Sequence, residues 1–269
     1  MATKRFIRWT ILTGVVLAAT VASGTVTAAL ATEDFQWSKV IAAGKEIEIK
    51  GVNGDISASL ATGKEVEVTA DKSAKKSDPA DVTIEVIEHE GGVTICAKYP
   101  AVHGKENVCG PGDEGHMNTQ DCDVRVDFQV RVPAGVRLVA RTVNGEVKAD
   151  GLQGPVEAAT VNGSVRVGTT SYASATTVNG SIVVSIGDAQ WTEPLSFETV
   201  NGKIRLTLPS KVDADVRAET INGSIDSDYP IIVSGSFNRR RLHGTIGKGG
   251  RRMDLQTVNG DIVLAQRSS

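Results

Sequence analysis

The chain contains little of what helical enzyme cores and cofactor sites are usually built from. Aromatic residues make up 4% of its 269 residues, and there are 3 Cys, 4 His, 3 Met and 3 Trp. No long helical period follows residue 31, and the apolar residues are mainly Val, Ile and Ala. This composition favours many short strands and turns over a core of packed helices.

The patterns that mark catalytic and metal sites are also missing. There is no Cys-x-x-Cys pair, no His in a recognisable catalytic phrase, and no calcium-binding nonapeptide of the toxin-type β-rolls. We therefore expect no catalytic residue, no metal and no cofactor. The formal net charge of −3 argues against a nucleic-acid partner.

What the chain does contain is one short phrase written seven times. A Val or Ile precedes Asn-Gly, and a polar residue and then Ile or Val follow it, as in TVNGSIV at 177–183. Asn and Gly take positive φ easily, so each pair predicts a sharp corner between strands. The predicted corners are Asn53, Gly54, Asn144, Gly145, Asn162, Gly163, Asn179, Gly180, Asn201, Gly202, Asn222, Gly223, Asn259 and Gly260.

The spacing of the copies indicates a stacked repeat. From Asn144 onward the gaps between successive Asn residues are 18, 17, 22, 21 and 37, and the last is close to two ordinary gaps, which suggests one coil without the phrase. Alternating apolar and polar residues follow each Asn-Gly, as in strands with one buried face. We expect an all-β β-solenoid with Val and Ile in inward ladders. The alternative is an antiparallel β-sandwich, because Asn-Gly is also a hairpin signal.

The first 31 residues resemble an export signal. Lys4, Arg5 and Arg8 precede an uncharged stretch that ends in Ala29-Leu30-Ala31, a small-x-small cleavage site. We expect cleavage before Thr32, or a retained membrane anchor, since the stretch is long enough to span a bilayer. Either outcome places the domain outside the cytosol, in the periplasm, at the cell surface or secreted.

The cysteines lie in a region without the phrase. We expect residues 32–135 to form an irregular β region that caps the stack, with a loop at 99–121, and residues 136–265 to form the solenoid, followed by a tail at 266–269. In an exported chain a disulfide is expected, and the candidates are Cys96 with Cys109 or, alternatively, with Cys122.

Two charged groups are candidate functional residues. An arginine-rich segment near the C-terminus could contact an anionic partner, or could simply be a solvated edge; it contains Arg239, Arg240, Arg241, Arg251 and Arg252. The carboxylates that a carbohydrate-active enzyme would need are densest at Asp213, Asp215, Asp226 and Asp228, and Asp261 could meet Asp213 or Asp226 on adjacent coils. We interpret these carboxylates as surface and turn residues.

The repeated TVNG phrases, the segment VDFQVRVPAGVRLVARTVNGEV at 126–147 and the ending GTIGKGGRRMDLQTVNGDIVL at 244–264 resemble the bacterial putative-adhesin domain family. The resemblance covers roughly residues 40–265. It implies a β-strand-repeat protein of the cell envelope, and it brings no catalytic residues.

We therefore expect an exported, non-catalytic binding or structural module. Its partner would be an envelope polymer or protein, with membrane contact only through an uncleaved N-terminal segment. Outward side chains such as Lys148, Arg166, Lys203 and Arg205 would make the contact. The alternatives are a carbohydrate-active enzyme on a β-solenoid and an accessory component of envelope-stress signalling.

Overall fold

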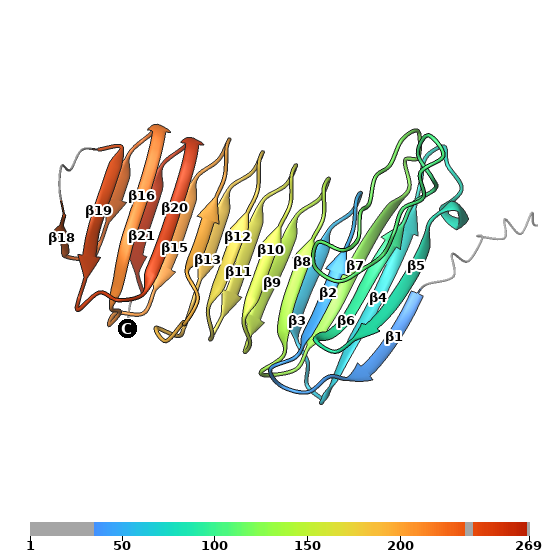
Figure 1. The fold of residues 1–269 in the computed structure, drawn as a ribbon, viewed down its shortest axis with the longest axis horizontal. Coiled ribbons are helices and arrows are strands. Elements are labelled where there is room, and N and C mark those ends of the chain that lie inside the picture. The colour runs from blue at the N-terminus through green and yellow to red at the C-terminus, as the bar shows by residue number, and fades with distance from the viewer. Residues whose placement is uncertain (1–34, 235–238, 268–269) are drawn as a thin grey trace, which may run out of the picture. The chain divides into compact units, whose positions relative to one another are not determined.

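The computed structural model describes residues 35–234 and 239–267, which belong to one compact unit. Two sheets face each other, and in each of them most neighbouring strands run parallel (Figure 1). The predicted β-solenoid is thus confirmed. The expected leader, residues 1–31, and the cleavage site before Thr32 lie outside the described residues. Within the described part of the chain, no helix has the length and apolar character needed to cross a membrane.

The strands of sheet 1 are, in spatial order, β1 (Phe35–Val40), β4 (Glu65–Ser73), β7 (Arg125–Val132), β3 (Ile56–Leu60), β9 (Val147–Leu152), β11 (Val165–Thr169), β13 (Ile182–Ser185), β15 (Ile204–Leu208), β21 (Ile262–Gln266) and β17 (Ile225–Ser227). The strands of sheet 2 are β18 (Ile231–Val233), β19 (Arg241–Ile246), β16 (Ala214–Asn222), β20 (Arg252–Asn259), β14 (Leu195–Glu198), β12 (Ala173–Thr176), β10 (Val156–Ala159), β8 (Arg137–Arg141), β2 (Glu46–Lys50), β6 (Gly92–Lys98) and β5 (Thr83–His89). A short 3-10 helix, Pro79–Asp81, joins β4 to β5.

Each coil consists of one strand of sheet 2, a corner and one strand of sheet 1. Period-2 alternation decides which side chains fill the space between the sheets. In β15, for example, Ile204 and Leu206 are fully buried while Arg205 between them is exposed. Equivalent residues pair from coil to coil, so that Ile182 lies beside Ile204 and Ile204 beside Ile262. The apolar core is therefore a set of parallel ladders.

The order of the coils in space differs from their order in the chain. The last coil, β20–β21, lies between β14–β15 and β16–β17, as the red strands in Figure 1 show. At the other end β2–β3 lies between β6–β7 and β8–β9. The expectation of a coil without the phrase between Asn222 and Asn259 was wrong. The described residues of that interval contribute antiparallel β18 and β19 beside β16, and the chain then returns into the stack.

Antiparallel strands close both ends of the parallel stack. β1 and β4 extend sheet 1 beyond β7, β5 extends sheet 2 beyond β6, and β19 and β18 extend sheet 2 beyond β16. The segment expected to be a tail begins inside β21 at Gln266, and the main-chain N–H of Arg267 donates to the carbonyl of Leu208. The chain thus stays on the sheet as far as residue 267.

Candidate binding surfaces

The seven repeat asparagines stand in a single row along one edge of the stack. Six of them donate the side-chain Nδ2 to the Oδ1 of a neighbouring asparagine at 2.7–2.8 Å, and Asn53 Nδ2 donates to the carbonyl of Val124 instead. The spatial order of this asparagine ladder is Asn53, Asn144, Asn162, Asn179, Asn201, Asn259 and Asn222. All the amides donate in the same direction, toward Asn53.

At six of the seven corners, the glycine after the asparagine is required for a different reason from the one the sequence suggested. Positive φ was expected at these corners, but within the described residues only Gly54 of the seven has it, at +135°. A Cβ atom at the other six would lie 1.9–2.0 Å from the carbonyl oxygen of the corresponding glycine in the next coil. At Gly180, for instance, that atom is the carbonyl oxygen of Gly163. Close stacking of the corners, rather than turn geometry, excludes a side chain.

A threonine two positions before the asparagine forms a second row, which the sequence analysis did not assign. Thr177 Oγ1 donates to the carbonyl of Gly163 at 2.8 Å, and Thr199 Oγ1 donates to that of Gly180 at 2.9 Å. The other threonines in this row are Thr142, Thr160, Thr220 and Thr257. All are buried, so each hydroxyl satisfies a carbonyl that would otherwise face the apolar interior. The recurring Thr of TVNG was the available signal.

The Val or Ile directly before the asparagine points outward in most copies of the phrase, whereas Val52 in the first copy is buried. Exposed fractions are 37% for Val161 and Val178, 38% for Val200 and 59% for Ile221. The expectation that all Val and Ile of the phrase form inward ladders was therefore wrong at this position. The reason is strand parity: the buried threonine is its immediate neighbour, and adjacent side chains point to opposite faces. The result is an exposed apolar row beside the asparagine ladder.

A groove of about 690 Å³ follows this apolar row across four coils. One wall carries Val178, Val200, Val258 and Ile221. The opposite wall carries the side chains two positions earlier, and an arginine pair lies at one end. We call this the corner groove; its remaining lining residues are Thr176, Thr177, Glu198, Thr199, Gln256, Thr257, Glu219, Thr220, Arg240 and Arg241.

The arginine-rich segment falls into two separate parts. The main-chain carbonyl of Arg239 accepts from Ile225 N, and that of Arg240 accepts from Thr220 N, so this part covers the edge of the terminal coil. Arg241 Nε lies 3.3 Å from Glu219, which also pairs with Arg217.

The second part is found at the other end of β16, where Arg252 lies beside Asp215 in the strand register. This is four residues, or roughly 13 Å of extended strand, from the position of Arg241. Arg252 pairs with Asp254 at 2.7 Å, and Arg251 donates to the side chain of Gln190. The five arginines therefore do not form one patch.

Cations also stand on the outward face of sheet 1. Arg166 pairs in register with Lys148 on one side and Val183 on the other, and Val183 pairs with Arg205. Lys148 forms an ion pair with Asp150, and Lys203, in the next row, pairs with Asp261. The guanidiniums of Arg166 and Arg205 are exposed and make no ion pair within the part of the chain that the structure describes.

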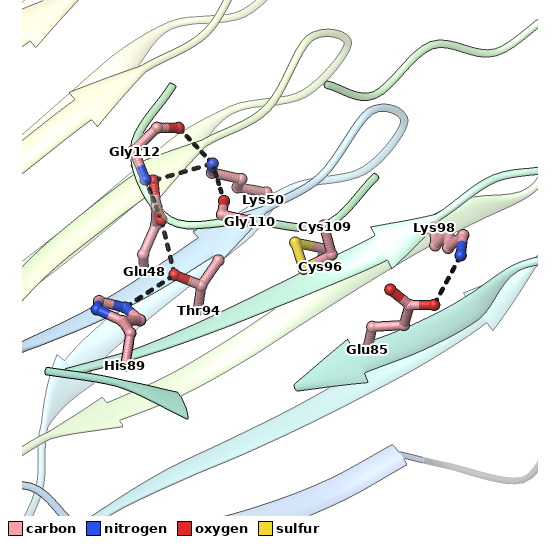
Figure 2. Close-up of a disulfide and its surroundings, with 10 residues drawn as sticks. All are labelled: Glu48, Lys50, Glu85, His89, Thr94, Cys96, Lys98, Cys109, Gly110 and Gly112. Atoms are coloured by element: carbon pink, nitrogen blue, oxygen red, sulfur yellow. Dashed lines mark hydrogen bonds and ion pairs between the residues drawn. A yellow bond between two sulfur atoms is a disulfide. The ribbon is translucent and has the colours of Figure 1, made fainter. Parts of the chain in front are cut away.

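Near the other end of the stack a loop folds over the outward face of sheet 2 (Figure 2). Cys109 in this loop forms a disulfide with Cys96 of β6, and Cys122 is a free thiol. Lys50, which is 7% exposed, donates to the carbonyls of Gly110 and Gly112. The loop thus covers a side chain that strand parity directs outward.

A carboxylate lies beneath the same loop. Glu48 is 1% exposed and accepts from the Thr94 hydroxyl at 2.9 Å and from the main-chain N–H of Gly112 at 3.0 Å (Figure 2). Its other oxygen lies 3.5 Å from Lys50 Nζ and 3.6 Å from Arg141 Nε. The cluster is a buried ion network, in which two cations offset the cost of burying one carboxylate.

Tyr99 begins the covering loop and joins it to the corner. Its hydroxyl donates to the carbonyl of Val124 at 2.8 Å and lies within 3.2 Å of the backbone of Asn53. Burial raises the pKa of Tyr99 to about 12. The first copy of the phrase has Gly51 where the others have Thr, and at this corner the Tyr99 hydroxyl contacts the backbone of Asn53.

The candidate carboxylates serve as hydrogen-bond acceptors in turns and between coils. Asp213 accepts from Lys248 N, and Asp215 accepts from Thr245 Oγ1 and Gly250 N, which orders the turn between β19 and β20. Asp228 accepts from Gln266 N.

Two more of them lie on sheet 1. Asp226 contacts the Ser224 hydroxyl at 3.4 Å. Asp261 accepts from Ser224 N and pairs with Lys203 at 3.0 Å, and this lysine lowers the pKa of the Asp261 carboxyl. Asp213 directly precedes β16 of sheet 2, so the structure does not bring Asp213, Asp226 and Asp261 onto one sheet.

A hollow of about 630 Å³ beside Tyr229 contains Asp213 and Arg251. Asp213 is the only carboxylate among its described lining residues, whereas glycoside hydrolysis needs two.

His89 contacts the buried Thr94 hydroxyl at 3.2 Å. Within the described residues, no three His, Cys, Asp or Glu side chains come together as a metal site would require.

Comparison with known proteins gives a family and distant structural likenesses. A family model described as Toastrack DUF4097 matches residues 18–265. No curated protein matches the chain. A putative cell adhesion protein from Clostridium sporogenes has 13% sequence identity and a TM-score of 0.47, with 87% of this chain and all of that one covered.

A putative adhesin from Bacteroides fragilis has 8% identity and a TM-score of 0.33, with 87% and 97% covered. A putative lipid binding protein from Parabacteroides distasonis has 12% identity and a TM-score of 0.30, with 86% and 96% covered. Likenesses this distant carry no information on function.

Proposed function

The chain belongs to the Toastrack DUF4097 family, and we propose that it is an exported, non-catalytic binding or structural module of the cell envelope. Its partner would be an envelope polymer or protein. The observation that supports this most is the outward face of sheet 1, where Arg166 and Arg205 are exposed without an ion-pair partner in the described residues.

The spacing of these two arginines suits contact with an extended partner. One strand, β13, separates β11 from β15, so the Cα atoms of the two arginines are about 9.6 Å apart along the stack if each strand advances 4.8 Å. A rigid backbone holds these positions, because β11, β13 and β15 are each paired on both sides. Arginine binds carboxylate and phosphate groups through a planar fork of donors. A partner that carries repeated anionic groups is therefore favoured.

The test is capture of host envelope fractions by the full-length exported protein. The double variant Arg166→Glu/Arg205→Glu should lose most of the captured material, because reversed charges repel the same anionic groups. The matched control is Lys64→Glu/Lys105→Glu, which changes the net charge equally at exposed sites away from this face. Equal losses in both variants would mean that net charge, and not this face, is responsible.

Export and lack of catalysis are tested separately. N-terminal sequencing should find Thr32 as the first residue, and a chain that still starts at residue 1 or 2 in the membrane would indicate the anchor. A screen of polysaccharide and peptidoglycan substrates should show no turnover above background. Turnover that Asp213→Asn, Asp226→Asn or Asp261→Asn abolishes would replace this proposal with an enzyme.

A further inference from the structure

One row of side chains runs across sheet 2 from end to end. The strand registers place Cys96 beside Lys50, Lys50 beside Arg141, and Arg141 beside Ala159. The row continues through Thr176, Glu198, Gln256, Glu219 and Arg241. Its first part is covered by the chain's own loop, and its last part is the polar wall of the corner groove.

The loop shows how this row holds a polypeptide segment. Cys109 is bound to Cys96, Gly110 and Gly112 accept from Lys50, and Asp113 accepts from Arg141 at 3.2 Å. Residues 109–113 thus follow the row along the stack axis, over three successive strands. Figure 2 shows the part of this contact from the disulfide to Gly112. Main-chain groups of small residues make most of the contact.

The corner groove presents the same kind of surface without a covering segment in the described residues. Glu198 and Glu219 can accept from main-chain N–H groups, Arg241 can donate to carbonyls, and Gln256 can do both. A peptide main chain carries one donor and one acceptor per residue, which suits such a mixed wall. Since Glu198 and Glu219 are balanced by Arg240 and Arg241, an uncharged segment fits better than an anionic one.

The other wall restricts the side chains of the occupant. Val178, Val200, Val258 and Ile221 give an apolar surface across four coils, and the polar wall stands only two residues away along each strand. Because the two walls are this close, the space between them fits the small side chains of Gly, Ala and Pro. The covering loop has Gly-Pro-Gly at 110–112 where it crosses the same row.

We propose that the corner groove binds an extended, uncharged peptide segment rich in Gly, Ala and Pro, supplied by a partner protein. The segment lies along the stack axis, as residues 109–113 do at the other end of the row. This surface is separate from the sheet 1 face that carries Arg166 and Arg205, so a negative result for one surface does not contradict the proposal for the other.

The probe is a fluorescein-labelled peptide with three Gly-Pro-Gly-Ala repeats, acetylated and amidated at its ends. Fluorescence polarisation with the full-length exported protein should show saturable binding. Glu198→Ala/Gln256→Ala should weaken it about tenfold, a loss of about 1.4 kcal/mol. Val178→Ser/Val200→Ser, which keeps the polar wall, should weaken it as well. All four substituted residues are exposed, and thermal melting checks that each double variant is folded.

The matched control is Ser57→Ala/Gln129→Ala at exposed positions on adjacent strands of the other sheet, which should bind the peptide as the unchanged protein does. No saturable binding, or equal binding by the groove variants, would overturn the proposal. Chitohexaose, a neutral β-linked glycan, is tested in parallel. Groove-dependent binding of this glycan with no binding of the peptide would overturn the peptide assignment and identify a glycan surface.

Discussion

Asn259 donates its side-chain amide to Asn201 Oδ1 at 2.7 Å, although 57 residues separate them in the chain. Asn222, which lies between them in sequence, instead donates to Asn259 from the outer side. The last repeat of the chain therefore lies between the repeats of Asn201 and Asn222, and not at the end of the stack. Closing the stack in this way leaves the short β17, and not the C-terminal strand, at the edge of sheet 1.

This ladder predicts a difference between inner and end positions. Asn179→Ala removes two side-chain hydrogen bonds, to Asn162 and from Asn201, whereas Asn222→Ala removes one. At about 0.5–1.5 kcal/mol for each bond, the inner substitution should lower the free energy of unfolding by about 1–3 kcal/mol and the end substitution by about half of that. Urea unfolding measures both. Equal effects would show that the bonds do not act as a ladder.

The repeat glycines should tolerate no side chain at all. Gly180→Ala places a Cβ 1.9 Å from the carbonyl oxygen of Gly163, and forced overpacking of this kind costs about 1–3 kcal/mol. Gly63→Ala is the control, because nothing lies within 4 Å of its Cβ position. Thermal unfolding should separate the two clearly.

A second substitution at the same site distinguishes the two explanations of the corner. If positive φ were the requirement, Gly180→Asn would be tolerated better than Gly180→Ala, since Asn enters that region more easily. The close contact with Gly163 instead predicts that Asn and Ala are equally destabilising or that Asn is worse. A clearly milder effect of Asn would contradict the stacking explanation.

The disulfide should keep the covering loop in place. Cys96→Ser/Cys109→Ser should lower the free energy of unfolding by roughly 2–4 kcal/mol, because the bond closes a loop of 13 residues. Amine-reactive labelling of Lys50, now shielded by the loop, should rise in this variant. Cys122→Ser is the control and should leave Lys50 protected. Three alkylatable thiols in the exported protein would rule the bond out.

Acid should weaken the main-chain hydrogen bonds that the Asp123 carboxylate accepts. Asp123 accepts from the main-chain N–H groups of Ser77, Lys76 and Lys75, and the bond from Ser77, first among these, lowers its pKa to about 2. Because the pKa of Asp123 is lower in the folded protein than in the unfolded one, the ionised carboxylate stabilises the fold at higher pH. This stabilisation is lost as the carboxylate is protonated. The stability advantage over Asp123→Asn should therefore be full above about pH 4 and should vanish as the pH falls toward 2. A pH-independent difference in melting temperature would contradict this.

The architecture of a single coil could be read from the sequence. The alternation of residues such as Ile204, Arg205 and Leu206 predicts which side chains are buried, and the Asn-Gly pairs predict where each coil turns. These are local properties, decided by strand parity and by the small size of Gly. The mostly parallel stack followed from the constant offsets, and the adhesin-like family from the phrase itself.

The order of the stack could not be read in the same way. The later copies of the phrase offer the same Asn donor, the same Thr hydroxyl and the same apolar ladder, so Asn259 could equally have stacked on the outer side of Asn222 as between Asn201 and Asn222. Only the closing of the end by β18 and β19 against β16 settles that choice. The outward direction of Val200 and the contact that excludes a Cβ at Gly180 likewise depend on the neighbouring coil.

The sequence by itself determined a coil, its corners and its buried faces, because these depend on residues a few positions apart. Tertiary structure alone decided where the 99–121 loop lies, which row its residues 109–113 cover and which part of that row becomes the corner groove. Those features depend on pairing between strands far apart in the chain, such as Lys50 with Cys96 and Glu219 with Arg241. Long-range registers of this kind are energetically specified only once the whole stack has formed.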